Sequence, residues 1–256
     1  MGNTDVGTMV QPSIASTVVF VLIVASLGAL FVWANYLASL RDAIAPKLVR
    51  KQTLSSAMLI CFILASTGFL AYSGILMHLA NSPALMIYFG GSNLLILGLA
   101  VSPWGRRLAH SLPLWALIAY QGFRLPLELV LHRWYEEGTL PIQMTYSGYN
   151  FDILSGIAAL VVGGLVQRGY LGRRSAWCFN VFGLTLLVTV ATIAVLSSPV
   201  PFRYYHEGPT VLMAFYLPFT WIIPMCVGGA LFGHVVLFRR LLTNENPLAM
   251  SSPYKI

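Results

Sequence analysis

The sequence predicts an all-α polytopic membrane protein, a single domain with seven transmembrane helices. Two observations lead to this prediction: most of the chain is apolar, and its positive charges fall in alternate gaps between the apolar runs. Of the 256 residues, 57% are hydrophobic and only 9% are charged, whereas a soluble domain carries about a quarter charged residues. The mean hydropathy is +0.76. We therefore expect this chain to lie in a lipid bilayer.

Seven apolar runs are long enough to cross a membrane, since a bilayer core needs roughly 20 apolar residues at 1.5 Å rise each. We place them at about residues 14–38, 55–80, 84–103, 112–134, 151–169, 175–198 and 210–238. They use most of the chain, so we expect no second, soluble domain. All three cysteines fall inside predicted spans, which argues against a disulfide framework.

The positive charges set the expected orientation. Arg133 and Arg203 fall on one side of the predicted spans, and Arg124 falls within a span. The opposite side has the other twelve: Arg41, Lys47, Arg50, Lys51, Arg106, Arg107, Arg168, Arg173, Arg174, Arg239, Arg240 and Lys255. Basic residues stay in the cytoplasm, so we expect the N-terminus outside and the C-terminus inside. The net charge of +7 then indicates contact with anionic lipids and not with nucleic acid.

Several runs carry local signals. In the run at 151–169, the small residues Gly156, Ala159 and Gly163 recur at helical spacing and would allow a neighbouring helix to approach closely. The loop of about residues 134–150 is apolar and aromatic, so we expect it to fold over the outer mouth. Asp152 follows this loop and is expected to cap the next helix. The last run contains two prolines and is expected to be kinked, which makes it the candidate moving part.

The fourth run contains the main candidate site. Five polar residues follow one another at steps of three and four and therefore share one helix face: Gln121, Arg124, Glu128, His132 and Tyr135. An unpaired charge at that depth costs at least roughly 2.5–3.5 kcal/mol, so the face is expected to point into the bundle. Arg124 and Glu128, four residues apart, are expected to pair. Pro126 cannot bond back to Gly122, which predicts a kink and a free carbonyl there.

This face has two interpretations. In the structural one, Arg124 and Glu128 neutralise each other and hold the helix to its neighbours. In the functional one, the face lines an outward-opening cavity that binds or transports a small polar or ionic solute. Arg124 would then bind an anion or carboxylate, Glu128 would be its counter-charge or a proton acceptor, and His132 and Tyr135 would lie at the entrance. We favour the functional interpretation, because intramembrane ionisable residues usually mark functional sites.

Histidines suggest an alternative function. His78, His132 and His206 are expected on the outer side, and His110 and His234 on the inner side. Paired histidines on different helices can hold a haem, and the weak metal candidates are His78, His132, His206 and His234. A third possibility is a non-catalytic subunit or sensor that acts through a membrane-protein partner or a homo-oligomer. No spacing motif supports a particular cofactor.

Some activities are excluded by missing residues. Retinal proteins need a lysine in the last span, and no lysine occurs between Lys51 and Lys255. Paired intramembrane aspartates, HExxH, P-loop and dinucleotide-binding motifs are absent as well. No residue is therefore assigned a catalytic role.

Three stretches of the C-terminal half carry a family resemblance. The first is Arg124-Leu125-Pro126-Leu127-Glu128. The second is the segment 141–156, which contains the sequences Pro-Ile-Gln-Met-Thr-Tyr and Asn-Phe-Asp-Ile-Leu-Ser-Gly. The third is Ser198-Pro199-Val200-Pro201-Phe202 together with the final span from Trp221 to His234. Together they resemble a group of uncharacterised bacterial multi-pass membrane proteins. The resemblance implies a bacterial inner membrane and no particular activity.

Overall fold

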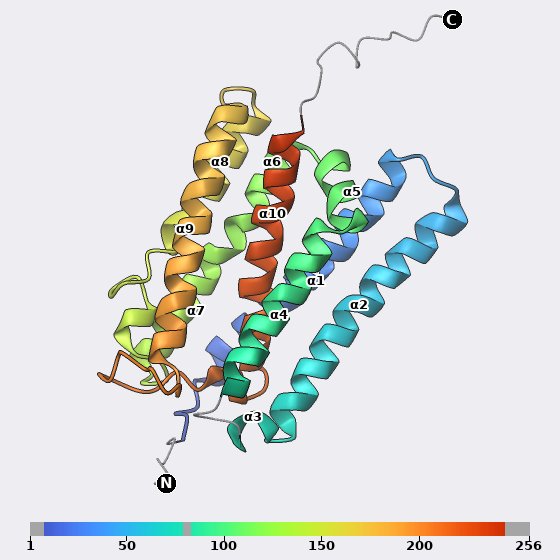
Figure 1. Ribbon diagram of the computed structural model, residues 1–256. Helices are drawn as coiled ribbons and strands as arrows, with labels where there is room; N and C mark the ends of the chain where they lie inside the picture. Colours follow the sequence, from blue (N-terminus) through green and yellow to red (C-terminus); the bar gives the residue numbers. More distant parts are fainter. Residues whose placement is uncertain (1–7, 79–82, 244–256) are drawn as a thin grey trace, which may run out of the picture.

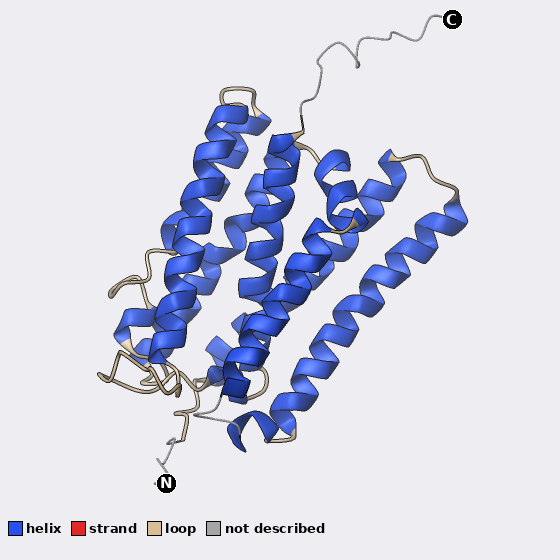
Figure 2. Ribbon diagram, viewed as in Figure 1, coloured by secondary structure: helices blue, strands red, loops and turns tan. Residues whose placement is uncertain are grey.

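The structure is a computed structural model that describes residues 8–78 and 83–243. Within these residues the chain forms helices, turns and loops without a strand, as Figure 2 shows. The longer helices run side by side between the two ends of one bundle (Figure 1). The expected all-α fold is thus confirmed.

The first half of the bundle contains α1 (Ile14–Arg41), α2 (Pro46–Tyr72), α3 (Ile75–His78), α4 (Pro83–Val101), α5 (Pro103–Ser111), α6 (Leu114–Ala119), the 3-10 turn η1 (Tyr120–Phe123) and α7 (Arg124–Glu136). The second half contains the 3-10 turn η2 (Ile142–Met144), α8 (Ile153–Gln167), α9 (Arg173–Ser197), the 3-10 turns η3 (Met213–Phe215) and η4 (Phe219–Trp221), the π-helical segment η5 (Ile222–Val227) and α10 (Gly228–Leu242).

Five helical segments are long and apolar enough to cross a membrane: Ile14–Arg41, Pro46–Tyr72, Leu114–Glu136, Arg173–Ser197 and Phe219–Leu242. A sixth span results if α4 and α5, which meet at a bend of 57°, are counted as one. The 15-residue α8 is apolar but shorter. The chain is therefore a polytopic membrane protein with five to six candidate spans among its described residues.

Helix boundaries differ from the predicted spans where prolines and caps act. Pro46 begins α2 nine residues earlier than expected, because a proline suits the first turn of a helix, where its missing N–H costs nothing. Ser102 ends the predicted run 84–103 early: its Oγ accepts a hydrogen bond from the Trp104 N–H at 3.1 Å and so starts α5. The last span begins at Phe219, after Pro218, so only Pro224 lies within it.

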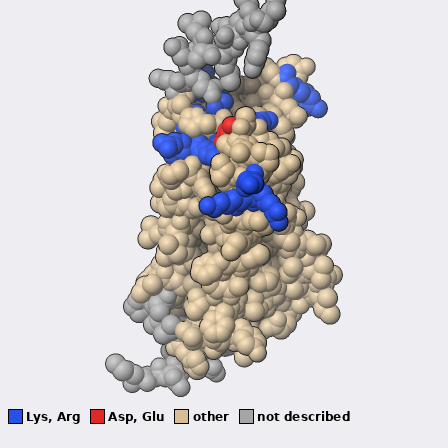
Figure 3. Space-filling model, turned by 90° about the vertical axis from the view of Figure 1, so that its right-hand side faces the viewer, with Lys and Arg blue, Asp and Glu red and all other residues tan. Residues whose placement is uncertain are grey.

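Basic residues gather at one end of the bundle. The end of α1, the start of α2, α5, the turn between α8 and α9 and the end of α10 all lie at the upper end in Figure 1. On the face shown in Figure 3, the Lys and Arg side chains lie in the upper half. Arg173 donates to the Thr243 carbonyl and Arg239 to the Ala100 carbonyl, which ties these helix ends together. Lys255 lies outside the described residues.

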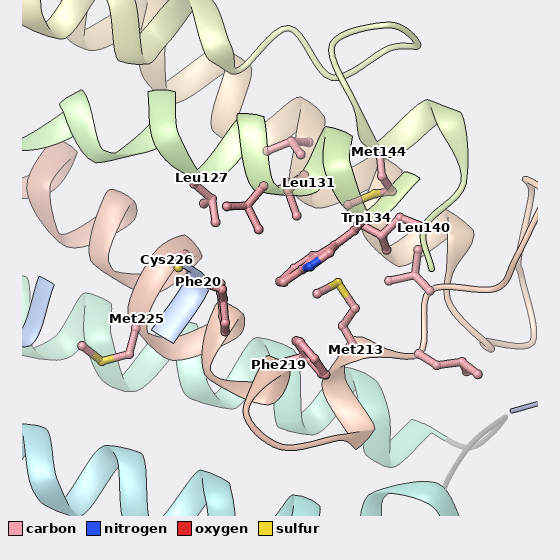
Figure 4. Close-up of a cluster of buried hydrophobic side chains, with 14 of the residues drawn as sticks. Phe20, Leu127, Leu131, Trp134, Leu140, Met144, Met213, Phe219, Met225 and Cys226 are labelled. Atoms are coloured by element: carbon pink, nitrogen blue, oxygen red, sulfur yellow. The ribbon is translucent and has the colours of Figure 1, made fainter. Parts of the chain in front are cut away.

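Trp134 is the centre of the hydrophobic core at the other end. Its ring centroid lies 5.2 Å from those of both Phe20 on α1 and Phe219 on η4. Its indole N–H donates to Ser16 Oγ at 3.1 Å. In Figure 4, these rings pack with Leu140 and other apolar side chains from several segments. This core fixes α7 relative to α1 and the last span.

The small residues of α8 allow close contact with α6 and α7, as predicted. A Cβ on Gly156 would lie 2.4 Å from the backbone N of Leu125, and one on Gly163 would lie 3.1 Å from the Ala119 Cβ. Distances below 3 Å cannot be accommodated without moving the backbone. The start of α8 therefore lies directly against the start of α7, where the candidate site is located.

Candidate functional site

The structure divides the predicted polar face into two parts. Gln121, Arg124 and Glu128 are buried, with exposures of 0%, 1% and 1%. Gln121 lies in the 3-10 turn η1, just before the helix α7 begins, so the irregularity expected near Pro126 occurs on its N-terminal side. Further along α7, His132 stacks on Tyr146 of the following loop, with ring centroids 4.3 Å apart, and its other ring neighbour is Tyr135 at 5.9 Å.

Arg124 is the centre of a buried polar network. Its Nε donates to Oδ2 of Asp152 at 2.6 Å, and its Nη2 pairs with the other oxygen of that carboxylate. Its Nη1 lies 2.7 Å from Ser155 Oγ, 3.0 Å from the Gly183 carbonyl and 3.2 Å from Nε2 of His234. One guanidinium therefore joins α7 to α8, α9 and α10.

The expected pair between Arg124 and Glu128 is wrong. Among the described residues, Glu128 forms no ion pair, and the carboxylate bound to Arg124 is that of Asp152. Asp152 can take this position because α7 and α8 approach so closely at Gly156. Asp152 occupies the N-cap position of α8, as predicted, but its side chain makes no capping hydrogen bond there and binds Arg124 instead.

His234 is held as a neutral ring by its two neighbours. Its Nδ1 lies 2.7 Å from Oδ1 of Asn180, and the Nδ2 of the same amide donates to the His234 carbonyl at 3.1 Å. The carbonyl oxygen of Asn180 accepts, so Nδ1 carries the proton and Nε2 accepts from Arg124. A Cβ on Gly183 would lie 2.7 Å from Cε1 of this ring, so the glycine makes room for it.

Glu128 is held by the loop between α7 and α8. Oε2 of Glu128 accepts a hydrogen bond of 2.7 Å from Nδ2 of Asn150, which also donates to the Met144 carbonyl at 3.0 Å. Oδ1 of Asn150 accepts from the Asp152 N–H at 3.0 Å. The loop folds back onto the bundle, where Asn150 links Glu128 to the backbone of Asp152. Its place over an outer mouth stays a prediction.

Glu128 lines a cavity of about 90 Å³, together with Arg124 and Asp152. The walls come from α4, α7, α9, η5 and α10, and nearly all are apolar. Five of the lining residues are drawn in Figure 4, namely Leu127, Leu131, Met144, Met213 and Cys226. At about 30 Å³ for each water in the liquid, this space corresponds to about three water molecules.

The buried charges of the site do not balance. Arg124 carries one positive charge, Asp152 and Glu128 carry one negative charge each when ionised, and His234 is neutral as bonded. Arg124 is saturated by its four neighbours. The uncompensated negative charge therefore lies on Glu128, which has a single hydrogen-bond donor beside an apolar cavity.

The histidines that were candidate metal ligands do not lie together in the structure. His78 and His206 are exposed, and both ring nitrogens of His234 are engaged by Asn180 and Arg124. In the described part of the chain, three or more His, Cys, Asp or Glu side chains nowhere form a group that could hold a metal ion.

Sequence reasoning missed two members of the network, Ser155 and Asn180. Both are polar residues inside otherwise apolar runs, and both are completely buried. Asn180 carried the clearer signal, because an amide inside a membrane span needs a hydrogen-bond partner.

Comparison with known families matches residues 82–242 to the domain of unknown function DUF8737. This segment is more than half of the chain, which therefore belongs to that family. It contains α4 through α10 and the complete buried network. No curated protein and no solved structure matches the chain.

Proposed function

We propose that this member of the DUF8737 family is an integral membrane protein that binds and transports a small polar or ionic solute at the Glu128 carboxylate. The observation that carries the proposal is the carboxyl group of Glu128, which is buried beside the cavity with one hydrogen-bond donor and no ion-pair partner among the described residues. A buried charge without a partner is costly, so Glu128 favours either a proton or a cationic, hydrogen-bond-donating solute. Arg124, bound to Asp152, positions the site and is a weaker candidate for anion binding.

The cavity limits the size of the solute. Pockets for drug-sized ligands have volumes of about 300–1,000 Å³, compared with about 90 Å³ here. The fitting solutes are those of a few non-hydrogen atoms, such as a proton carried by water, ammonium or methylammonium. The apolar walls favour a cation that sheds its water easily, because they offer few replacement hydrogen bonds.

The last span is the proposed moving part. Its π-helical segment η5 contributes Ile222, Ile223 and Cys226 to the cavity wall, and Pro224 lies between them. π-helical turns inside α-helices occur frequently at functional sites. A change from π to α geometry there would shift side chains that now close the cavity.

The topology belongs to the same proposal. If α8 crosses the membrane together with the bent α4–α5 pair and the five long segments, the chain has seven spans. The positive-inside rule then places the basic end of the bundle in the cytoplasm of a bacterial inner membrane, with the N-terminus outside. His132 and Tyr135 would lie at the outer entrance, above Glu128.

Proteoliposomes provide the test. The purified protein is reconstituted with the internal pH dye pyranine for protons, or supplied with radiolabelled methylammonium outside. We expect transport of at least one of these probes above the rate of empty liposomes, loss of it in Glu128→Gln, and retention in the control Glu136→Gln, whose side chain is 49% exposed on the same helix. Equal rates for Glu128→Gln and the unmodified protein would refute the function of Glu128.

A further inference from the structure

A second hollow lies at the basic end of the bundle, separate from the Glu128 cavity. It has a volume of about 470 Å³ and is lined by apolar residues of α1, α5, α6, η1, α8 and α10. Leu30, Trp33, Trp115 and Leu160 on its lining are exposed by 39%, 57%, 36% and 50%, so the hollow is a groove that opens on the outer surface. In a membrane protein this surface faces lipid.

The groove extends from the end of the bundle to its middle. Along α1 its lining begins at Leu30 and ends at Arg41, eleven residues apart, which is about 16 Å at 1.5 Å per residue. One leaflet of the hydrocarbon core is about 15 Å thick, half of the total of about 30 Å. The groove is therefore about as long as one acyl chain lying along the helices.

A single charged side chain lines the groove, and it stands at the basic end. Arg41 is exposed, and its Nη1 donates to the Ser111 carbonyl at 2.6 Å. Among the described residues Arg41 has no carboxylate partner, because the nearby Asp42 is bound by Arg107 at 2.7 Å. The other guanidinium N–H groups of Arg41 make no hydrogen bond within the described residues and are therefore available to an anion at the membrane surface. A phosphate bound there would complement this charge.

From this arrangement we propose that the groove binds one anionic phospholipid, with its phosphate at Arg41 and an acyl chain along α1 and α6. The match of length and the charge at one end single out a lipid of the leaflet at the basic end. Basic pockets between membrane helices on the cytoplasmic side are known to bind anionic headgroups. The proposal is independent of any solute at Glu128.

Native mass spectrometry of the full chain, delipidated in detergent and titrated with phosphatidylglycerol or phosphatidylcholine, tests the proposal. We expect one tightly bound phosphatidylglycerol. Arg41→Gln should weaken its binding about fivefold, the effect of one basic side chain at an anionic surface, and should leave phosphatidylcholine binding unchanged. Arg174→Gln, which removes an exposed charge away from the groove, is the matched control.

A second pair of variants tests the acyl chain. Ala116→Phe fills the groove from the α6 side and should abolish binding of the tight lipid, whereas Ala65→Phe on the exposed face of α2 should not. The proposal is overturned if Arg41→Gln and Arg174→Gln bind phosphatidylglycerol equally, or if Ala116→Phe keeps the tight lipid. A dimer mass that disappears in Ala116→Phe would instead identify a second copy of the chain as the occupant. Each variant must retain the melting temperature of the unmodified protein for its lipid result to count.

Discussion

The ion pair between Arg124 and Asp152 makes the strongest prediction about stability. Asp152→Asn keeps the shape of the side chain but removes the charge that faces Nε and Nη2 of Arg124. The side chain of Arg124 is 1% exposed, so bulk solvent cannot replace the lost carboxylate. Removing one partner of a buried ion pair costs about 3–5 kcal/mol, because the other charge is left uncompensated.

For a domain of this size, about 1 kcal/mol shifts the melting temperature by about 2–4 °C. Asp152→Asn should therefore lower the apparent melting temperature by about 6–20 °C, measured in detergent by intrinsic tryptophan fluorescence, to which the buried Trp134 contributes. Glu136→Gln is the matched control, since that carboxylate is half exposed, pairs with Arg133 at 3.0 Å and lies 3.8 Å from Nε2 of His132. Such pairs contribute about 0–1 kcal/mol. Equal melting temperatures for the two variants would show that the buried pair does not hold the bundle.

Glu128→Gln should behave differently from Asp152→Asn. The amide oxygen of a glutamine can still accept the hydrogen bond from Asn150, and the substitution removes the surplus negative charge. We therefore expect a melting temperature at or above that of the unmodified protein, together with loss of transport. A large loss of stability in Glu128→Gln would mean that this carboxylate, and not Asp152, compensates Arg124.

Two further predictions concern packing and pH. Gly156→Ala should destabilise the protein by about 1–3 kcal/mol, because the new Cβ would lie 2.4 Å from the backbone N of Leu125. Gly164→Ala should be neutral or slightly stabilising in the same melting assay, because its Cβ would meet only Nη1 of Arg168, at an ordinary contact distance of 3.8 Å. At the end of the bundle opposite the basic residues, partial burial alone would raise the pKa of Glu137. Hydrogen bonds led by those from the Ser13 hydroxyl and N–H outweigh this effect and hold the pKa of Glu137 below its ordinary value of 4.5. The stabilisation of the start of α1 is therefore present above pH 4.5 and lost as the pH falls through the lowered pKa. Protection of the Ser13 amide from hydrogen exchange, compared with Glu137→Gln at the same pH, should decrease there. A protection ratio that does not change with pH would contradict this.

The sequence was sufficient for the fold class and the burial of the polar face, because both follow from local composition. Arg124 and Glu128 lie in a largely apolar run, where a charge that faced lipid would be costly. The ion pair between Arg124 and Asp152 was not predictable in the same way. It depends on the approach of α8 to α7 at Gly156, which brings Asp152 within 2.6 Å of a guanidinium 28 residues earlier.

The irregular helical segments of the last span were also not predictable from the sequence. Two prolines predicted a kink in the last span, but a proline does not specify which geometry replaces the helix. The 3-10 turn η4 and the π-helical η5 follow from packing against Trp134 and the cavity, which are distant in sequence. The same holds for His234, whose neutral form depends on Asn180 from another helix.

The two N-terminal helices differ in how much they matter to the rest of the bundle. The family segment begins after both of them, yet Phe20 and Ser16 of α1 complete the surroundings of Trp134, whereas α2 lies at the edge in Figure 1 and packs mainly on α1. A relative that shared only the segment from residue 82 onward would need another helix in the place of α1. Without one, the indole of Trp134 would be exposed to the acyl chains of the lipid. Beyond α1, α2 is held to the start of the last span by the hydrogen bond from Nε1 of Trp221 to the Leu64 carbonyl at 3.0 Å, so its loss would leave that indole N–H without its acceptor.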